Sequence, residues 1–252
     1  MQRRGFLLIV AVVALALSGC HTKHVPASST DADTQAGDTK ITNSAQNLAP
    51  HPEGPPAPVT ARPQISDTRP LVVCFGDSLT AGHGTDLGQS YPDYLQADLD
   101  ALGYRYRVVN EGISGNTTKD GVDRLGRVLS MKPSVVVVEF GGNDGLRGLP
   151  IADTRANLDK IIGTLKSNRI KVVLAGITLP PNYGPDYIQQ FNATYTLLAR
   201  KYHVPMLPFL LKGVFGVPGM MQEDMTHATA AGNKIVAKNI LPLVTPLLKR
   251  AR

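Results

Sequence analysis

From Leu71 onward, short apolar runs alternate with longer stretches whose apolar residues recur at helical spacing. The runs are too short for helices, and strands that alternate with helices build a parallel sheet from βαβ units. One run, Val135-Val136-Val137-Val138, is continuously apolar, as expected for a central strand that helices cover on both faces. The pattern predicts strands at Leu71–Phe75, Arg107–Asn110, Val135–Phe140, Val172–Ile177 and near Met206.

The intervening stretches predict helices at Tyr91–Leu102, Thr118–Met131, Asp153–Asn168, Tyr187–Tyr202 and Thr229–Leu248. Together these elements predict an α/β fold, a three-layer α/β/α sandwich around a central, mostly five-stranded parallel sheet. In such folds the loops at the carboxyl ends of the strands form the ligand crevice. We therefore look for functional residues in those loops.

Residues 1–19 have the layout of a secretory signal peptide, with Arg3 and Arg4 ahead of an apolar run that ends in Leu17-Ser18-Gly19-Cys20. The run is too short to span a bilayer comfortably. Its end resembles a bacterial lipobox, which implies cleavage before Cys20 and a lipid anchor on that residue. The alternative is an ordinary secretory peptide with an incidental cysteine. General and twin-arginine export both stay open.

Residues 20–69 are predicted to form a disordered tether behind the lipidated Cys20, and residues 70–252 a single folded domain. From His21 to Arg69 the sequence has no Phe, Tyr or Trp and is dominated by small polar residues, Ala and Pro. Such a segment buries too little apolar area to offset the entropy lost on ordering. We therefore expect an exported protein at the bacterial cell membrane or outer membrane, facing the periplasm or the exterior.

The formal charge of +6 is not accompanied by a nucleic-acid-binding motif, so a nucleic-acid partner is excluded. Apart from Cys20, the sequence has one cysteine, Cys74, which lies in the first apolar run. We expect a buried, unreactive thiol there. With Cys20 lipidated, no internal disulfide is possible.

A serine follows the first predicted strand in Gly76-Asp77-Ser78. At a strand-to-helix turn, the hydroxyl of Ser78 and its own N–H can both face the crevice. Gly-Asp-Ser is also ordinary turn and helix-cap chemistry. Thr80 stands where the second glycine of a Gly-x-Ser-x-Gly elbow belongs, so the motif is not that elbow.

A serine nucleophile needs a histidine base and a group that orients the base. The predicted domain has three histidines, His83, His203 and His227. His227 follows Asp224 by three residues, so one turn of chain can place the carboxylate beside the imidazole. An Asp-x-x-His pair that merely caps the last helix is the alternative. We expect His203 to be structural and His83 to line the loop beside Ser78.

Two further strand-end loops contain Gly115, within residues 110–117, and Asn143, within residues 140–147. A glycine N–H and an amide side chain are donors that acyl transfer needs at the developing oxyanion. Each loop alone is also consistent with a turn that merely ends a strand. Neither has the lysine of a phosphate-binding loop, and Gly82-His83-Gly84 lacks the third glycine of a dinucleotide fingerprint.

Taken together, these segments resemble the GDSL/SGNH hydrolase family, whose name-giving Ser, Gly, Asn and His fall on Ser78, Gly115, Asn143 and His227. The resemblance is closer to its bacterial thioesterase, arylesterase and lysophospholipase branch, through the runs at 76–79, 113–117, 141–148 and 179–184. It implies the flavodoxin-like SGNH hydrolase fold and a triad of Ser78, His227 and Asp224. It also implies an oxyanion hole made by Ser78 N–H, Gly115 N–H and Asn143, with no metal or organic cofactor.

The predicted function is hydrolysis of carboxylic esters or thioesters of acyl chains, with a small acyl ester or a lipid as substrate. Carbohydrate O-deacetylation in the cell envelope and non-catalytic lipid binding by a lipoprotein are the alternatives. The acyl groove is expected to involve residues 180–184 and some of Leu146, Leu149, Phe209, Phe215 and Met220, most of which are expected to pack in the core. The natural substrate, acyl-chain length, choice of membrane and oligomeric state stay open.

Overall fold

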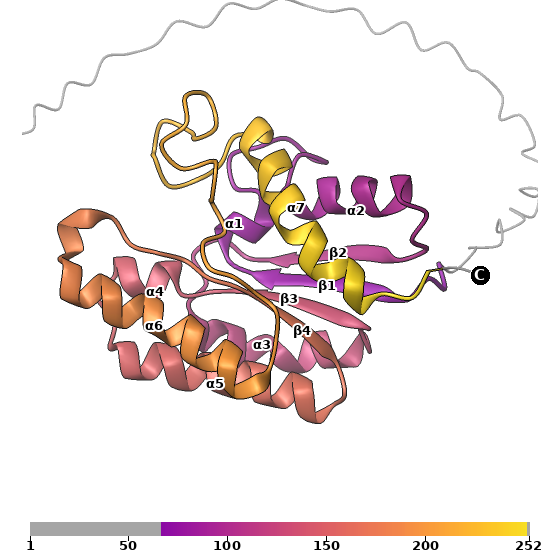
Figure 1. Cartoon of the computed structure of the whole chain (residues 1–252), viewed down its shortest axis with the longest axis horizontal. Helices are drawn as coiled ribbons and strands as arrows, with labels where there is room; N and C mark the ends of the chain where they lie inside the picture. Colours follow the sequence, from indigo (N-terminus) through magenta and orange to yellow (C-terminus); the bar gives the residue numbers. More distant parts are fainter. Residues whose placement is uncertain (1–66, 251–252) are drawn as a thin grey trace, which may run out of the picture. The chain divides into compact units, whose positions relative to one another are not determined.

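The structure, a computed structural model, describes residues 67–250 (Figure 1). The predicted signal peptide at 1–19, Cys20 and the predicted tether up to residue 66 lie outside the described residues. Within residues 67–250, no helix has the length and apolar character that a membrane span requires.

A five-stranded parallel sheet forms the centre of the described domain, as predicted. Its strand order is β2-β1-β3-β4-β5, which places the valine-rich strand β3 in the middle. Since the strands are parallel, all their carboxyl ends lie at one edge of the sheet. The strands are β1 (Leu71–Gly76), β2 (Arg107–Gly112), β3 (Val135–Glu139), β4 (Lys171–Ala175) and β5 (Met206–Leu207).

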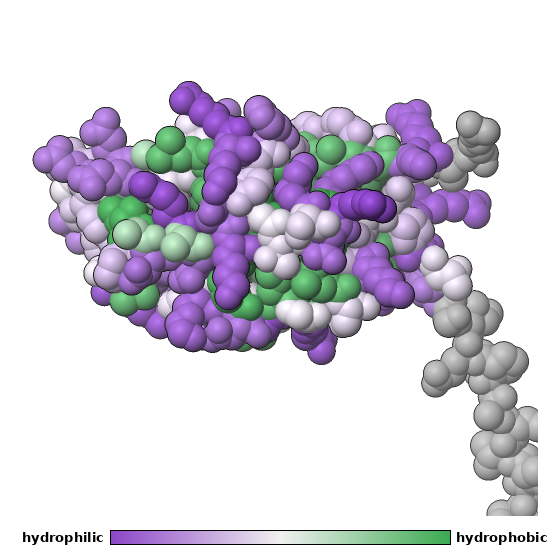
Figure 2. Space-filling model, turned by 90° about the horizontal axis from the view of Figure 1, so that it is seen from below, coloured by the Kyte–Doolittle hydropathy of each residue, from purple (hydrophilic) through white to green (hydrophobic). Residues whose placement is uncertain are grey.

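Helices cover both faces of the sheet and complete the predicted three-layer sandwich (Figure 1). Helices α2 (Tyr91–Ala101) and α7 (Ala230–Val244) contact each other on one face. On the other face, α5 (Ile151–Ser167) lies against both α3 (Thr118–Ser130) and α6 (Pro185–Tyr202). The outer surface of this second layer is mostly hydrophilic, with scattered hydrophobic spots (Figure 2).

The core is built on the two central strands. Residues 135–138 of β3 and 72–75 of β1 have no exposed surface, which explains their unbroken apolar sequence. The rings of Phe75 and Phe140 meet edge to face, with 4.9 Å between their centroids. Cys74 is buried and free, as predicted, and burial raises the pKa of its thiol to about 12.

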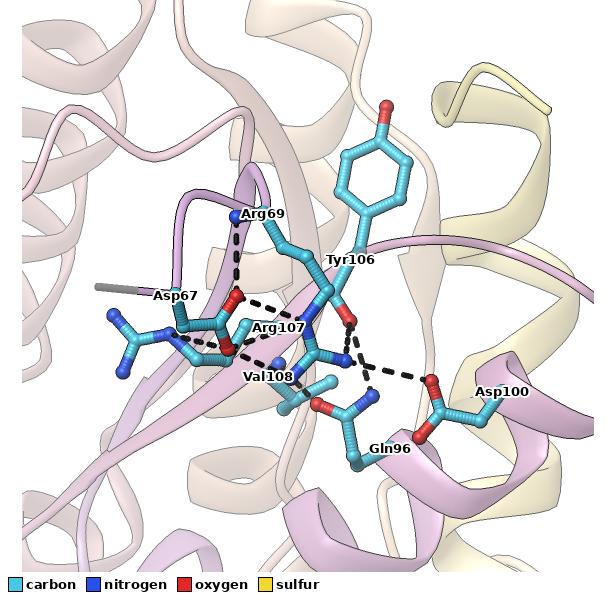
Figure 3. Close-up of polar contacts among 7 residues, drawn as sticks. All are labelled: Asp67, Arg69, Gln96, Asp100, Tyr106, Arg107 and Val108. Atoms are coloured by element: carbon cyan, nitrogen blue, oxygen red, sulfur yellow. Dashed lines mark hydrogen bonds and ion pairs between the residues drawn. The ribbon is translucent and has the colours of Figure 1, made fainter. Parts of the chain in front are cut away.

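The outer edge of β2 is closed by side chains (Figure 3). Gln96 of α2 accepts a hydrogen bond from Val108 N–H at 2.7 Å and donates to the Tyr106 carbonyl at 3.0 Å. These bonds satisfy backbone groups that an edge strand otherwise leaves open. Beside them, the side chains of Asp67 and Arg69 form an exposed ion pair, with 2.7 Å between Nη2 and Oδ2.

Three short helices were not predicted, because one turn of chain is too short to show helical periodicity. They are α1 (Ser78–Ala81), α4 (Gly142–Leu146) and the 3₁₀ turn η1 (Pro181–Tyr183). The last predicted helix is too long at its end: α7 stops at Val244 and continues as the 3₁₀ turn η2 (Thr245–Leu247). Pro246 has no N–H to continue the α-helical pattern.

Candidate active site

The turn between β1 and α1 positions Ser78 at the carboxyl edge of the sheet, where α1 and α4 lie (Figure 1). Asp77 caps α1, because its Oδ1 accepts a hydrogen bond from Leu79 N–H at 3.0 Å. A Cβ on Gly76 would lie 2.6 Å from the carbonyl oxygen of Glu139, so only glycine fits before Asp77. Ser78 thus begins a helix whose first turn is held by the Asp77 cap and by the close packing of Gly76 against Glu139.

Ser78, His227 and Asp224 lie together, although Ser78 and His227 are 149 residues apart in the chain. The distance from Ser78 Oγ to His227 Nε2 is 2.8 Å, and the distance from His227 Nδ1 to Asp224 Oδ2 is 2.5 Å. With a proton on Nδ1, the serine hydroxyl donates to Nε2 and Nδ1–H donates to the carboxylate. A nucleophile, a base and an orienting carboxylate require this arrangement.

Asp224 is held by the loop to which it belongs. Its Oδ1 accepts hydrogen bonds from Thr226 N–H at 2.9 Å and His227 N–H at 3.0 Å. Met225 adopts a positive φ of 52°, which lets the chain turn back on itself. Partial burial raises the pKa of Asp224, but the hydrogen bonds from His227 and Thr226 outweigh it and lower the pKa to about 2. The carboxylate is therefore ionised at neutral pH.

Gln222 connects the loop that carries His227 to the loop that follows Ser78. Its Nε2 donates to the His83 carbonyl at 2.7 Å and to the Ala228 carbonyl at 2.9 Å. Its backbone N–H donates to the His227 carbonyl at 2.8 Å. No sequence pattern marks Gln222, because its partner His83 lies 139 residues away.

The predicted oxyanion donors Gly115 and Asn143 follow β2 and β3, the two neighbours of β1. Gly115 has a φ of +82°, a conformation that favours glycine. A Cβ there would have a single neighbour within 4 Å, the Arg147 Nη2 at 3.8 Å. Among the described residues, the N–H groups of Ser78 and Gly115 have no hydrogen-bond acceptor. Both are available to a bound ligand.

The side chain of Asn143 is oriented by two acceptors. Its Nδ2 donates to the Asn116 carbonyl at 2.9 Å and lies 3.3 Å from Asp77 Oδ2. An amide nitrogen has two hydrogens, and the longer contact is the weaker one. An incoming oxygen atom can therefore compete with Asp77 for the second hydrogen while Asn116 keeps the amide in place.

A buried carboxyl pair lies behind Ser78. Asp77 is 2 % exposed, and Glu139 at the end of β3 has no exposed surface. Glu139 Oε2 accepts hydrogen bonds from the Thr80 hydroxyl at 2.8 Å and from Asp77 N–H at 3.3 Å. Burial raises the pKa of Asp77 to about 6. Burial, together with the charge of Asp77, raises the pKa of Glu139 well above its usual value.

Arg124 of α3 connects the ends of β1 and β2 to the loop that carries Gly115. Its guanidinium donates to the Gly76 carbonyl at 2.7 Å, the Glu111 carbonyl at 2.9 Å and Asn116 Oδ1 at 2.7 Å. The Asn116 carbonyl in turn accepts a hydrogen bond from the side-chain amide of Asn143. One half-buried side chain therefore fixes the relative positions of three segments of the site.

An apolar cleft of about 330 Å³ opens beside Ser78. Leu146, Phe209 and Phe215 line it, as do two residues of the predicted 180–184 loop, Pro180 and Pro181. The other apolar lining residues, which were not predicted, are Leu79, Ile177, Leu179, Leu211 and Met225. Such a lining suits an apolar ligand.

Two predicted lining residues, Leu149 and Met220, do not line the cleft. Met220 instead packs against the hydrophobic core, and Leu149 follows the end of α4 with its side chain 37 % exposed. Residues 182–184 are also absent from the wall. Tyr183 donates to the Leu146 carbonyl at 2.8 Å, so this part of the loop supports α4 from outside.

The two other histidines of the domain have different environments. The ring of His83 lies 4.6 Å from the ring of His227, and its Nδ1 is 3.4 Å from Ser114 Oγ. His203 ends α6 in the left-handed conformation, with a φ of 50°, which agrees with its predicted structural role. Across residues 67–250, no three His, Cys, Asp or Glu side chains form a group that could hold a metal ion.

Comparison with protein families gives a match over residues 74–235 to the family described as GDSL-like Lipase/Acylhydrolase. The matched segment contains Ser78, Gly115, Asn143 and the Asp224/His227 pair. It therefore spans every element from which the site is built, from β1 to the first half of α7.

Two curated relatives are similar over most of the described domain. Esterase TesA of Pseudomonas aeruginosa is 44% identical over 178 residues, which cover 70% of this chain and 89% of the relative. Thioesterase 1/protease 1/lysophospholipase L1 of Escherichia coli K12 is 36% identical over 191 residues, covering 74% of this chain and 89% of the relative. Among solved structures, the crystal structure of TesA matches with a TM-score of 0.68 and 43% identity, over 71% of this chain and 99% of that one.

Proposed function

The chain belongs to the GDSL-like lipase/acylhydrolase family, and on that premise we propose that it is a serine esterase that hydrolyses carboxylic esters or thioesters of acyl chains. One observation carries the proposal. His227 is hydrogen-bonded through Nε2 to Ser78 Oγ and through Nδ1 to Asp224, and this triad lies at the wall of an apolar cleft. The names of the relatives, esterase and thioesterase/lysophospholipase, support the same class of reaction.

The first half of the reaction acylates the enzyme. Ser78 Oγ attacks the carbonyl carbon of the substrate as His227 Nε2 takes the hydroxyl proton. Asp224, ionised because of its lowered pKa, stabilises the imidazolium that forms. The carbonyl oxygen, which becomes negatively charged, accepts hydrogen bonds from Ser78 N–H, Gly115 N–H and the Asn143 amide.

Collapse of the tetrahedral intermediate breaks the bond to the leaving alcohol or thiol, and His227 returns the proton to the leaving atom. Water then attacks the acyl-serine, with His227 again as the base. The same donors stabilise the second oxyanion. Breakdown releases the fatty acid and restores the Ser78 hydroxyl, so atoms and protons balance over the cycle.

The cleft favours an acyl chain as the group that is transferred. Its walls are built from Leu146, Leu179, Phe209, Phe215 and other apolar side chains, which bind hydrocarbon better than they bind a sugar. This lining is the reason to prefer acyl esters over the O-acetyl sugars considered from the sequence.

The test is the Ser78→Ala variant, assayed on p-nitrophenyl esters of increasing chain length. We expect a loss of kcat on the order of 10⁶-fold, because no other group supplies the nucleophile. Ser130→Ala, an exposed serine at the end of α3, is the matched control and should keep full activity. Undiminished turnover by Ser78→Ala would contradict the mechanism.

A fluorophosphonate probe tests the same residue without a substrate assumption. Wild-type protein should be labelled on Ser78, and the Ser78→Ala variant should not be labelled. Absence of labelling in the folded wild-type protein would favour non-catalytic lipid binding.

We also propose that the protein is exported and anchored by a lipid on Cys20, on the basis of the lipobox in the sequence. The Cys20→Ala variant should leave the membrane fraction. Retention in that fraction would contradict the lipid anchor.

A further inference from the structure

The two sides of Ser78 differ in chemistry. The apolar cleft lies on one side, and its lining includes none of His83, Ser114, Gly115 and Arg147. These four residues are polar or small, and they are linked to one another or to His227 by short contacts. An ester has two arms, so a substrate whose acyl chain fills the cleft directs its leaving group toward this polar side.

The position of His227 defines where the leaving group lies. Its Nε2 returns a proton to the leaving atom, so that atom must come within hydrogen-bond distance of Nε2. Outside the cleft, the side chain that faces the imidazole is His83, with 4.6 Å between the ring centroids. Ser114 Oγ lies 3.4 Å from His83 Nδ1. The leaving group therefore passes polar groups that include an imidazole and a hydroxyl.

Arg147 adds a positive charge at this place. Its Nη2 donates to the Gly115 carbonyl at 2.9 Å and is the one atom within 4 Å of the open position above Gly115. Between residues 67 and 250, no carboxylate lies within ion-pair distance of its guanidinium, and its other N–H groups have no acceptor. The neighbouring acid, Asp120, accepts its hydrogen bonds from Thr117, at 2.8 and 2.7 Å.

We propose that Arg147, with Ser114 and His83, forms a subsite for a leaving group that carries a phosphate. The inference rests on the proposed esterase function and specifies the substrate class. A guanidinium binds phosphate through paired N–H donors, and hydrogen bonds between two charged groups are stronger than neutral ones. Since Arg147 lies against the residue that donates to the oxyanion, the phosphate it meets is close to the scissile bond.

This distance separates two sources of phosphate. In a monoacyl glycerophospholipid, the phosphate is only a few bonds from the ester. In an acyl-CoA thioester, the phosphates lie at the far end of a long pantetheine arm. The position of Arg147 favours the glycerophosphate leaving group.

The experiment compares kcat/KM for a monomeric lysophosphatidylglycerol with kcat/KM for a monoacylglycerol of the same chain length. In Arg147→Gln, which removes the charge but keeps a polar side chain, the ratio of the two should fall about tenfold through a higher KM for the phospholipid. Arg147→Lys should restore part of the ratio. Lys119→Gln, which removes an exposed cation paired with Asp123, is the control and should leave the ratio unchanged.

Three other outcomes would contradict the proposed subsite. Equal losses on both substrates would mean that Arg147 only positions Gly115, and an unchanged ratio would mean that it meets no phosphate. A third substrate, an acyl-CoA of the same chain length, is measured beside them, and a loss of kcat/KM confined to it would assign Arg147 to the coenzyme instead of the glycerophosphate. Failure of the wild-type protein to hydrolyse the neutral monoacylglycerol and p-nitrophenyl esters would contradict the esterase function itself, which separates the two failures.

Discussion

Ser78 and His227 are held by different kinds of structure. On the side of Ser78, Asp77 is 2 % exposed and Glu139 is fully buried, and both belong to segments at the ends of central strands. On the side of His227, the Asp224 side chain is 44 % exposed and is held mainly by backbone N–H groups of its own loop. The nucleophile depends on the whole fold, whereas the orientation of the base depends on a few neighbouring residues.

This difference separates stability from activity. A buried polar group that loses its partner is costly, so substitutions behind Ser78 should weaken folding and catalysis together. An exposed carboxylate contributes little to stability because water and salt screen it. Substitutions in the Asp224 loop should therefore reduce catalysis alone.

The largest effect is expected from Asp224→Asn. The amide no longer stabilises the imidazolium and permits the wrong tautomer of His227, so kcat should fall about 10³- to 10⁴-fold. The free energy of unfolding, measured with urea, should change by less than about 1 kcal/mol. Glu223→Gln, at the adjacent exposed acid, should change neither quantity. A large loss of stability in Asp224→Asn would remove the contrast between the two sides.

The second effect concerns Arg124 behind Ser78. Arg124→Met removes the charged donor of the Glu111 carbonyl and one of the two donors of the Gly76 carbonyl, which keeps its bond from Ile113 N–H, so the free energy of unfolding should fall by about 3 kcal/mol. The kcat should fall as well, because the loop of Gly115 loses its contact through Asn116. Urea unfolding and ester kinetics measure the two losses.

Arg124→Lys is the informative companion variant, since an ammonium keeps the charge but cannot reach three acceptors in one plane. It should retain more stability than Arg124→Met while kcat stays reduced. Arg105→Met, at an exposed position, controls for the loss of a cation. Full stability of Arg124→Met would show that the ends of β1 and β2 do not depend on this guanidinium.

The fold was predictable where the sequence has a strong period. The valine run in β3 and the helical spacing of α3, α5 and α6 identified the layers, and the sheet has the expected strands. The ends of elements were less predictable, because α1 and α4 form from single turns and Pro246 changes the last turn of α7 to 3₁₀ geometry. Capping and packing, not periodicity, decide such ends.

The candidate site divides in the same way. Ser78, Gly115 and Asn143 follow the ends of strands and His227 precedes α7, each within a recognisable motif, so they could be identified from the sequence. Gln222 and Arg124 act through contacts with residues that are distant in the chain, which no local pattern records. Glu139 did carry a signal, since it is the one charged residue in the predicted strand Val135–Phe140.

The two sides of the site should also differ in the direction of their pH dependence. Burial raises the folded pKa of Asp77 to about 6, from 3.8, and raises that of Glu139 well above 4.5. The stability that these groups contribute is complete below the unfolded values and is lost as the pH rises through the folded ones. Asp224 behaves oppositely: with its pKa lowered to about 2, its contribution is present above pH 3.8 and is lost as the pH falls toward 2.

Glu139→Gln tests the buried side and has the smallest expected effect at a single pH. Glutamine resembles the protonated acid, so its carbonyl still accepts from Thr80 and from Asp77 N–H, and stability at pH 4.5 should stay within about 1 kcal/mol of wild type. Wild-type protein should lose stability from pH 4.5 to 7.5 by up to about 1.4 kcal/mol per pH unit for each proton taken up on folding. Glu139→Gln should lose less stability over this range, because its glutamine does not ionise in the unfolded chain. Urea unfolding across this range measures both slopes, and identical slopes would mean that Glu139 is ionised in the folded protein.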